Sequence, residues 1–263
     1  MIALLAGLYK KMISLLNKVV LPFVSLLVFV AVWQMAAGQY PPEQFPAPTD
    51  VLKAIKELAD SGVLWGHIGI SLARFGTAYL VAVTVAIPLG LFFGSFSRCH
   101  AAIDPLIQVL RPISPIAWFP LAVLWFGIGN APAVFIIFLA AFYPVLLTTI
   151  SAVRTVPKVY LKVATNFGAG SGMTFLRVIV PAAFPGIMVG LHIAVGTAWI
   201  HLVAGEMLGA QSGLGFMIVD ARNFLRTDQV MAGMLLVGLL GLVIYKGMKA
   251  AESFIGRRWG IVA

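Results

Sequence analysis

The chain has 263 residues, of which 61% are apolar and only 10% are charged, and its mean hydropathy is +1.01. Soluble globular chains are usually about 45–50% apolar and about 25% charged, so this chain has too few polar side chains to cover a water-soluble fold. Its nine carboxylates, four histidines and one cysteine are too few for a metal cluster or a disulfide framework. The composition excludes most soluble enzymes and predicts an all-α, polytopic membrane protein.

The net charge of +9 does not indicate a nucleic-acid partner. The sequence has no run of five basic residues, and its aromatic residues lie inside apolar stretches. Membrane proteins collect Lys and Arg in their cytoplasmic loops, which accounts for the excess. The lone Cys99 cannot form a disulfide within the chain, and it is either incidental or a reactive thiol.

Hydropathy predicts six transmembrane helices, because each needs about 20 mostly apolar residues. The stretches are 19–38, 69–96, 103–126, 131–153, 183–207 and 229–251. The third contains prolines at positions 105, 112, 115 and 120, so we expect a broken or kinked helix there. No inverted repeat is visible, which favours a chain that forms half of a transporter.

The distribution of basic residues predicts that both termini are cytoplasmic. With this orientation 13 of the 18 basic residues lie on the cytoplasmic side, as the positive-inside rule expects. These 13 are Lys10, Lys11, Lys18, Arg98, Arg111, Arg154, Lys158, Lys162, Arg177, Lys246, Lys249, Arg257 and Arg258. The outer side then holds Lys53, Lys56, Arg74, Arg222 and Arg226.

Residues 1–18 are predicted to form an N-terminal interfacial helix, because their polar residues gather on one face. The alternative is a signal peptide cleaved near Ala36–Gly38, which the long apolar stretch and the five further spans disfavour. Residues 19–263 would then form one six-span transmembrane domain. Its longest outer loop, 39–67, contains an amphipathic segment at Val51–Leu58.

The loop between the fourth and fifth spans, residues 154–182, is predicted to form a basic helix–turn–helix on the cytoplasmic face. Pro157 suits a helical first turn, and a helix from Lys158 can end at Gly168, where positive φ costs a glycine little. A second short helix would run from Met173 to Val180 and stop at Pro181.

This loop resembles the signature loop of bacterial ABC-transporter permeases, which reads Glu-Ala-Ala, three residues, Gly, nine residues, Ile, one residue, Leu-Pro. The matching positions here are Ala164, Gly168, Val178, Val180 and Pro181. Lys162 stands in place of the family's glutamate, so no role of that glutamate is carried over. The segments Arg111–Pro120, Trp125–Gly129 and Ala204–Leu208 resemble the nitrate, sulfonate, taurine and bicarbonate branch of these permeases.

The resemblance implies a type I importer permease in the bacterial inner (plasma) membrane. Two copies would form a homodimer and its translocation pathway, surrounded by membrane lipid. A cytoplasmic coupling helix would dock on a separate ABC ATPase subunit, and a periplasmic or lipid-anchored solute-binding protein would deliver a small anion. The residues expected to couple to the ATPase are Lys158, Lys162, Ala164, Gly168 and Pro181.

The sequence predicts no cofactor or metal in this chain and no catalytic activity of its own. It has no Gly-x4-Gly-Lys-Ser/Thr segment, so ATP and Mg²⁺ are expected on the ATPase subunit. His192 and His201 are nine residues apart, on opposite sides of a helix, so they cannot share a metal. A membrane hydrolase would need a nucleophile–base pair at one depth, and none is found.

The candidate pathway residues are Arg111, Ser114, Thr197, His201 and Glu206. Polar groups inside spans tend to face a cavity or a partner, and Thr197 and His201 share one helical face. His201 could instead form a hydrogen bond to a neighbouring helix, and Glu206 could be a structural acid near the outer interface. A stand-alone secondary transporter or channel is the alternative function, although the spans show neither coupling carboxylates nor a repeat.

Two further features leave alternatives open. The small residues at 186, 190, 194 and 198 recur every four positions in the fifth span, and they permit close packing either within one protomer or at a dimer axis. The turn-rich outer segment 209–215 and the acidic loop 43–60 are either a docking surface for the binding protein or ordinary solvated loops.

Overall fold

The computed structural model describes residues 20–258, and every regular element in that range is a helix. In chain order they are α2 (Leu21–Ala37), α3 (Pro48–Asp60), α4 (Val63–Ser95), α5 (Ser97–Leu110), η2 (Pro115–Trp118), α6 (Phe119–Phe126), α7 (Asn130–Arg154), α8 (Lys158–Asn166), α9 (Ser171–Thr174), η3 (Phe175–Ile179), α10 (Val180–Gly209), α11 (Leu214–Asn223) and α12 (Thr227–Arg258). The predicted all-α class is confirmed. The predicted interfacial helix at 1–18 lies outside the described residues.

Four helical stretches are long and apolar enough to cross a membrane: Val63–Ser95, Asn130–Arg154, Ser171–Gly209 and Thr227–Gly256. They correspond to the second, fourth, fifth and sixth predicted spans. The first predicted span coincides with α2, an apolar helix of 17 described residues. The segment Val51–Leu58, predicted to be amphipathic, folds within helix α3, and a further short helix, α11, follows α10.

The third predicted span is broken, as its prolines indicate. Ser97–Leu110 and Pro115–Phe126 meet at an angle of 84°, and they make a fifth span only if the bent pair is taken as one. Pro115 and Pro120 occupy the first turns of η2 and α6, where a missing N–H costs nothing. The break falls at residues 111–114, which bear the side chains of two pathway candidates.

The core is formed where α7 packs against both α4 and α10. A Cβ added to Gly90 of α4 would lie 2.6 Å from Cβ of Thr149, and one added to Gly190 of α10 would lie 2.9 Å from Cβ of Thr148. Ala194 and Ala198 are fully buried in the same core. The small residues of the fifth span therefore pack within the protomer, which decides between the two alternatives left by the sequence.

The predicted helix stop at Pro181 is wrong. Ser171–Gly209 is one continuous helical stretch, in which Pro181 occupies the first turn of α10. The preceding segment η3 is a π-helical turn. Its wider i→i+5 pattern accommodates a residue that has no N–H and whose ring crowds the preceding turn of an α-helix.

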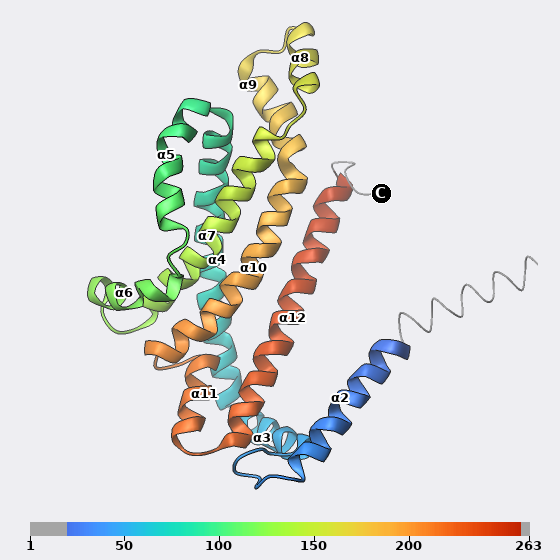
Figure 1. Ribbon diagram of the computed structural model, residues 1–263, viewed down its shortest axis with the longest axis vertical. Helices are drawn as coiled ribbons and strands as arrows, with labels where there is room; N and C mark the ends of the chain where they lie inside the picture. The colour runs from blue at the N-terminus through green and yellow to red at the C-terminus, as the bar shows by residue number, and fades with distance from the viewer. Residues whose placement is uncertain (1–19, 259–263) are drawn as a thin grey trace, which may run out of the picture.

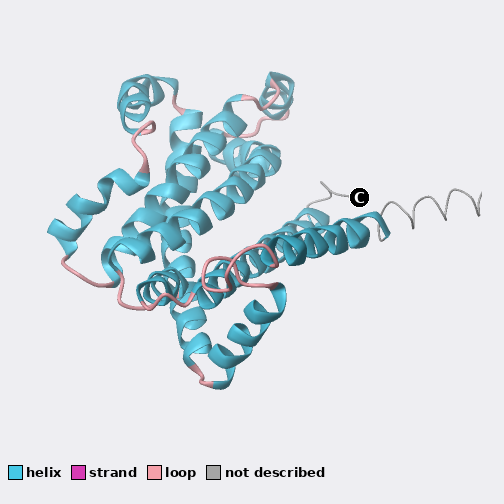
Figure 2. Cartoon of the chain, turned by 60° about the horizontal axis from the view of Figure 1, so that its bottom comes forward, coloured by secondary structure: helices cyan, strands magenta, loops and turns pink. Residues whose placement is uncertain are grey.

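Figure 1 shows how these elements place the functional segments. Helix α8 projects at one end of the molecule beside α9, while α3 and α11 lie at the opposite end. Helix α5 runs back along α4 from the α8 end, and Ile103 and Ile107 pack into the core with Ala82 and Ala86. Figure 1 and Figure 2 show that α2 lies apart from the bundle of α4, α7 and α10.

Candidate functional site

A cavity of about 340 Å³ lies between α7, α10 and the break in the third span. Its walls combine one face of α7 with one face of α10, closed by the chain that follows α5. The lining residues are Arg111, Ile113, Pro115, Leu139, Ala140, Tyr143, Pro144, Leu147, Thr148, Ile193, Thr197 and His201. The structure thus brings together three of the five predicted pathway residues, Arg111, Thr197 and His201.

Arg111 supplies the positive charge of this cavity. It follows directly after α5, whose 14 residues span about 21 Å, so it lies well inside the length of the bundle. Its side chain is exposed, and its guanidinium forms no hydrogen bond or ion pair with any residue between 20 and 258. A charge within a membrane is costly unless it meets water or a counter-charge, so Arg111 stays a candidate pathway residue.

His201 is oriented by the backbone of its own helix. Its Nδ1 lies 2.7 Å from the carbonyl oxygen of Thr197. A carbonyl only accepts, so Nδ1 carries a proton and Nε2 remains available to the cavity. Nε2 accepts a hydrogen bond in the neutral ring and donates one in the imidazolium form.

The hydroxyl of Thr197 is used within the fold. Oγ1 lies 2.9 Å from the carbonyl oxygen of Ala140 on α7 and 3.1 Å from that of Ile193 on α10. Because a hydroxyl has one proton to donate, these carbonyls compete for it. Thr197 therefore joins α10 to α7 beside the cavity and supports the segment that presents His201.

Two predicted pathway residues do not line the cavity. Ser114 lies between Ile113 and Pro115, which do, and its carbonyl accepts the N–H of Ala117 at the start of η2. Glu206 lies one turn of α10 or more beyond His201, buried to 1% exposure. It belongs to a second polar cluster near the α11 end of the bundle.

That cluster is centred on an ion pair between Glu206 and Arg74. Arg74 Nη1 lies 2.7 Å from Glu206 Oε1, and the two side chains are 4% and 0% exposed. Ser71 Oγ lies 2.8 and 2.9 Å from the two carboxylate oxygens, and the N–H of Gly215 donates to Oε2 at 2.9 Å. The geometry supports the structural reading of Glu206, because its oxygens are already occupied.

Arg74 extends the cluster to α7 and to the loop after α10. It donates to the carbonyl oxygen of Ser212 at 2.6 Å, to Ser212 Oγ at 2.8 Å and to Asn130 Oδ1. The N–H groups of Gly213 and Leu214 donate to His67 Nδ1 and Ser71 Oγ. The cluster therefore fixes the turn-rich segment 209–215 against α4, and this segment is not a free solvated loop.

Sequence reasoning missed this pairing and counted Arg74 among the outer-side charges. Arg74 lies within the predicted span 69–96, and the structure places it inside α4, which begins at Val63, so its side chain is buried and not on the outer side. A signal was available: Arg74 and Glu206 are single charges of opposite sign in two apolar helices, and such charges usually pair.

Four of the five predicted coupling residues lie in or directly after α8. Lys158 and Lys162 are exposed on α8, whereas Ala164 is buried on its inner side. Gly168 has φ +74°, and the N–H groups of Gly168 and Ala169 donate to the carbonyls of Thr165 and Ala164 at 2.9 Å each. This is a glycine C-cap, as predicted. Pro181 lies farther along, inside the continuous helix.

The outer surface of α8 is apolar as well as basic. Val159, Tyr160, Val163 and Phe167 are 63%, 52%, 46% and 87% exposed. Exposed apolar patches rimmed by charge mark interaction sites. The sequence analysis did not single out these four residues, although Tyr160 and Phe167 beside the signature alanine and glycine would have indicated them.

At the opposite end, Arg226 connects the loop before α12 to α3. Its guanidinium lies 2.8 Å from Glu57 and 2.9 Å from Asp228, and these hydrogen bonds raise the pKa of Arg226 above its ordinary value. Within residues 20–258, no group of three His, Cys, Asp or Glu side chains is placed to hold a metal ion.

Comparisons with known proteins agree with this architecture. Residues 86–260 match the family described as binding-protein-dependent transport system inner membrane component. The chain is 35% identical to the taurine transport system permease protein TauC of Escherichia coli over 90% of this chain and 88% of the relative. It is 33% identical to the nitrate import permease protein NrtB of Synechocystis, with 90% of each chain covered.

A solved structure shares the fold. The MetNI methionine ABC transporter, in an inward-facing conformation, matches with a TM-score of 0.62 at 15% identity, covering 75% of this chain and 96% of that one. The family match covers well over half of the chain and both relatives align over most of their length. The protein is therefore a multi-pass membrane protein that belongs to the family of binding-protein-dependent transport system inner membrane components, the permease subunits of ABC importers.

Proposed function

We propose that the protein forms the membrane pathway of an ATP-driven importer for a small oxyanion. The observation that carries this proposal is the cavity in which the unpaired guanidinium of Arg111 and Nε2 of His201 are available within the bundle. Nitrate, bicarbonate, taurine and other sulfonates all carry an anionic group with several oxygens, which suits the guanidinium of Arg111 and, in its imidazolium form, Nε2 of His201. The names of the nitrate and taurine relatives support the same substrate class.

The energy would come from a separate ABC ATPase that binds ATP and Mg²⁺. Helix α8 offers a basic and apolar docking surface at the end of the bundle, which supports this division of labour. A second copy of the chain would complete the pathway as a homodimer. A periplasmic or lipid-anchored solute-binding protein would dock at the opposite end, over α3, α11 and the segment held by Glu206.

The α8 end is proposed to be cytoplasmic, with both termini on that side of the bacterial inner membrane. Arg98, Arg154, Lys158, Lys162 and Arg177 lie at or next to this end, as the positive-inside rule expects. The opposite end carries acidic residues of α3 and the start of α12, including Glu57 and Asp228.

The continuity of Ser171–Gly209 suggests how docking moves the pathway. A shift of α8 by the ATPase passes into α9 and η3, and from there along one unbroken helix to Thr197 and His201. The close contacts of Gly186 and Gly190 with α7 make α7 and α10 move together. Such a rigid-body motion would open the cavity alternately to the two sides.

Uptake by reconstituted complexes tests the proposal. The permease, its ATPase and its binding protein are placed in proteoliposomes, and ATP-dependent uptake of labelled nitrate, bicarbonate and taurine is compared. We expect uptake of at least one of these anions, its loss in Arg111→Gln and partial retention in Arg111→Lys. Lys249→Gln, an exposed cation on α12 outside the cavity and outside both proposed docking surfaces, is the control and should transport normally.

Two results would contradict the proposal. Uptake by this chain alone, driven by an ion gradient, would favour a stand-alone secondary transporter or channel. Full uptake by Arg111→Gln, with the complex intact, would remove the cavity from the pathway.

A further inference from the structure

Helices α4 and α7 each contain an internal proline, Pro88 and Pro144. Proline has no N–H, so the carbonyls of Thr84 and Ala140, four residues earlier, do not receive the hydrogen bond that an ordinary residue would donate. Sharp bends of helices occur most often at proline. The two helices are therefore weakened at residues 84–88 and 140–144.

In α10 the corresponding feature is Thr197. Its Oγ1 lies 3.1 Å from the carbonyl oxygen of Ile193, one turn earlier in the same helix, and 2.9 Å from that of Ala140. A threonine hydroxyl that bonds back to its own helix tends to bend that helix. The second acceptor is the carbonyl that Pro144 leaves free, so the hydroxyl connects the weakened segments of α7 and α10.

Packing contacts place the three segments at one level of the bundle. Gly90 of α4 lies against Thr149 of α7, and the next contact, one turn farther along both helices, keeps the same parallel register. That register aligns residues 84–88 with 143–147. The hydrogen bond from Thr197 to α7 brings the turn of α10 that ends at Thr197 to the same level. Three fully buried residues of these stretches share one core cluster: Ala86, Val145 and Ala194.

The bundle is held firmly on both sides of this level. Toward the α11 end, the buried ion pair of Arg74 and Glu206, with the hydrogen bond of Arg74 to Asn130, ties together α4, α10 and the start of α7. Toward the α8 end, α4 and α10 pack against α7 through glycines that leave no room for a Cβ. These glycines are Gly90, Gly94, Gly186 and Gly190. Bending is therefore concentrated between the two ends.

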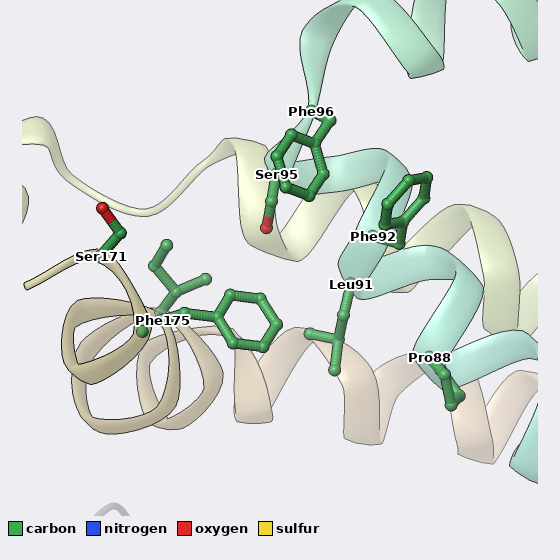
Figure 3. Close-up of a pocket in the computed structure, with 9 residues that line it drawn as sticks. Pro88, Leu91, Phe92, Ser95, Phe96, Ser171 and Phe175 are labelled. Atoms are coloured by element: carbon green, nitrogen blue, oxygen red, sulfur yellow. The ribbon is translucent and has the colours of Figure 1, made fainter.

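Both prolines border open space. Pro88 lines a cavity of about 640 Å³ between the last turns of α4 and the segment α9–η3. Figure 3 shows Pro88 on α4 and, farther along, the ring of Phe175 pointing across toward Leu91. Pro144 lines the proposed pathway cavity, together with His201. A bend at either proline therefore changes the shape of a cavity without pressing on packed core.

We propose that residues 84–88, 140–144 and 193–197 form one hinge, on which the α8 half of the bundle turns against the α11 half. The inference rests on the proposed function, because the ATPase supplies the motion through α8. Thr148 lies on the α8 side of the hinge and His201 on the α11 side, and both line the pathway cavity. Turning one half against the other moves these two walls and changes the side to which the cavity opens.

Pro88→Ala tests the hinge without altering the lining of the pathway cavity, to which Pro88 does not belong. Alanine supplies the missing N–H, and proline is the least favourable residue inside a helix, so α4 becomes stiffer. In the reconstituted complex we expect the thermal midpoint to hold or rise while ATP-dependent uptake falls several-fold. A proline that served only the packing of α4 would lower both when replaced.

Pro185→Ala is the matched control. Pro185 is also an exposed proline inside a helix, but it lies in the α8 half, about 12 Å along α10 from Ile193. The substitution likewise restores an N–H to a helix, and uptake should stay at the level of the wild type. Unchanged uptake in Pro88→Ala, or an equal loss in Pro185→Ala, would overturn the hinge.

A second measurement does not depend on the transported anion. The reporter is Leu139→Cys, which lines the pathway cavity, in a chain whose only native cysteine is removed by Cys99→Ser. The complex is held in nanodiscs, and modification of the permease by a membrane-impermeant maleimide is timed with and without ATP and vanadate. We expect the labelling rate to change several-fold with nucleotide in the reporter and in its Pro185→Ala variant, and to lose this response in its Pro88→Ala variant.

The outcomes of the labelling separate the hinge from the proposed function. An equal nucleotide response in the reporter and in its Pro88→Ala variant would overturn the hinge and leave oxyanion transport untouched. A complex that takes up no oxyanion, but whose labelling responds to ATP only while Pro88 is present, would contradict only the proposed substrate. A reporter without any response to ATP would contradict both the hinge and alternating access.

Discussion

The guanidinium of Arg74 and the carboxylate of Glu206 form an ion pair 2.7 Å apart at 4% and 0% side-chain exposure, although 132 residues separate them in the chain. Glu206 also accepts hydrogen bonds from the Ser71 hydroxyl and the Gly215 N–H. Arg74 also donates hydrogen bonds to Ser212 and Asn130. The pair therefore connects α4 and α10 with the start of α7 and the segment before α11.

Removing one member of this pair should destabilise the fold strongly. Glu206→Gln leaves the guanidinium of Arg74 buried without a counter-charge, a change that typically costs about 3–5 kcal/mol. We expect a lower thermal midpoint of the detergent-purified protein, measured by loss of the monodisperse peak in size-exclusion chromatography. The double variant Arg74→Met/Glu206→Met should recover much of the loss, because no charge is then buried unpaired.

The control for this prediction is an exposed ion pair. Lys53 and Asp50 lie 3.0 Å apart on α3 with 78% and 38% side-chain exposure. Lys53→Gln should change stability by less than about 1 kcal/mol. If Glu206→Gln and Lys53→Gln had the same thermal midpoint, the buried ion pair would contribute no more to the stability of the fold than the exposed one, which would contradict the prediction.

Gly213 should not tolerate alanine. Its φ of +104° is unfavourable for any residue with a Cβ, and a Cβ there would contact the carboxylate of Glu206. We expect Gly213→Ala to cost at least about 1–2 kcal/mol and to lower the same thermal midpoint. Gly66→Ala is the comparison: Gly66 lies within α4 with open space around its Cα, so alanine should be neutral or stabilising. A lower thermal midpoint for Gly66→Ala than for Gly213→Ala would contradict the tight packing of Gly213 against Glu206.

The long-range pairing explains what the sequence could and could not indicate. Hydropathy located α4, α7, α10 and α12, and local glycine and proline rules located the end of α8 and the break after α5, because each depends on neighbouring residues. The pairing of Arg74 with Glu206 depends on which faces of two distant helices meet. Spacing along the chain carries no such information.

For the pathway candidates, too, the sequence indicated the residues but not their contacts with distant helices. Composition indicated Arg111, Thr197 and His201 as polar groups in apolar segments, and the cavity brings them together. Their individual hydrogen bonds were not predictable, because the Thr197 hydroxyl bonds to Ala140 across a helix interface. The continuation of the helix through Pro181 was not predicted either. It depends on the π-helical turn η3, for which the sequence gives no recognisable pattern.

Thr149→Val should stabilise the protein. Thr149 is 0% exposed and its Oγ1 has no hydrogen-bond partner within residues 20–258, a state that costs about 1–3 kcal/mol. Valine has nearly the same shape and removes the hydroxyl, so the thermal midpoint should rise. Thr148→Val is the matched control, because Thr148 Oγ1 lies 3.2 Å from the Val145 carbonyl and also bonds to Pro144, and its loss should lower the midpoint. A fall in both variants would mean that Thr149 has a partner in the folded protein.

Gly168→Val should abolish docking of the ATPase while leaving membrane insertion intact. Gly168 caps α8 at φ +74°, a conformation that a β-branched residue strains, so the last turn of α8 should unwind and displace Phe167 from the docking surface. Co-purification of the ATPase with the tagged permease measures the loss. Gly170→Val, two residues farther on at φ −68°, keeps the cap and should retain the ATPase. Because both variants add the same side chain to the same loop, equal retention of the ATPase would contradict the role of α8, whereas loss in Gly168→Val alone would place the contact on the capped helix.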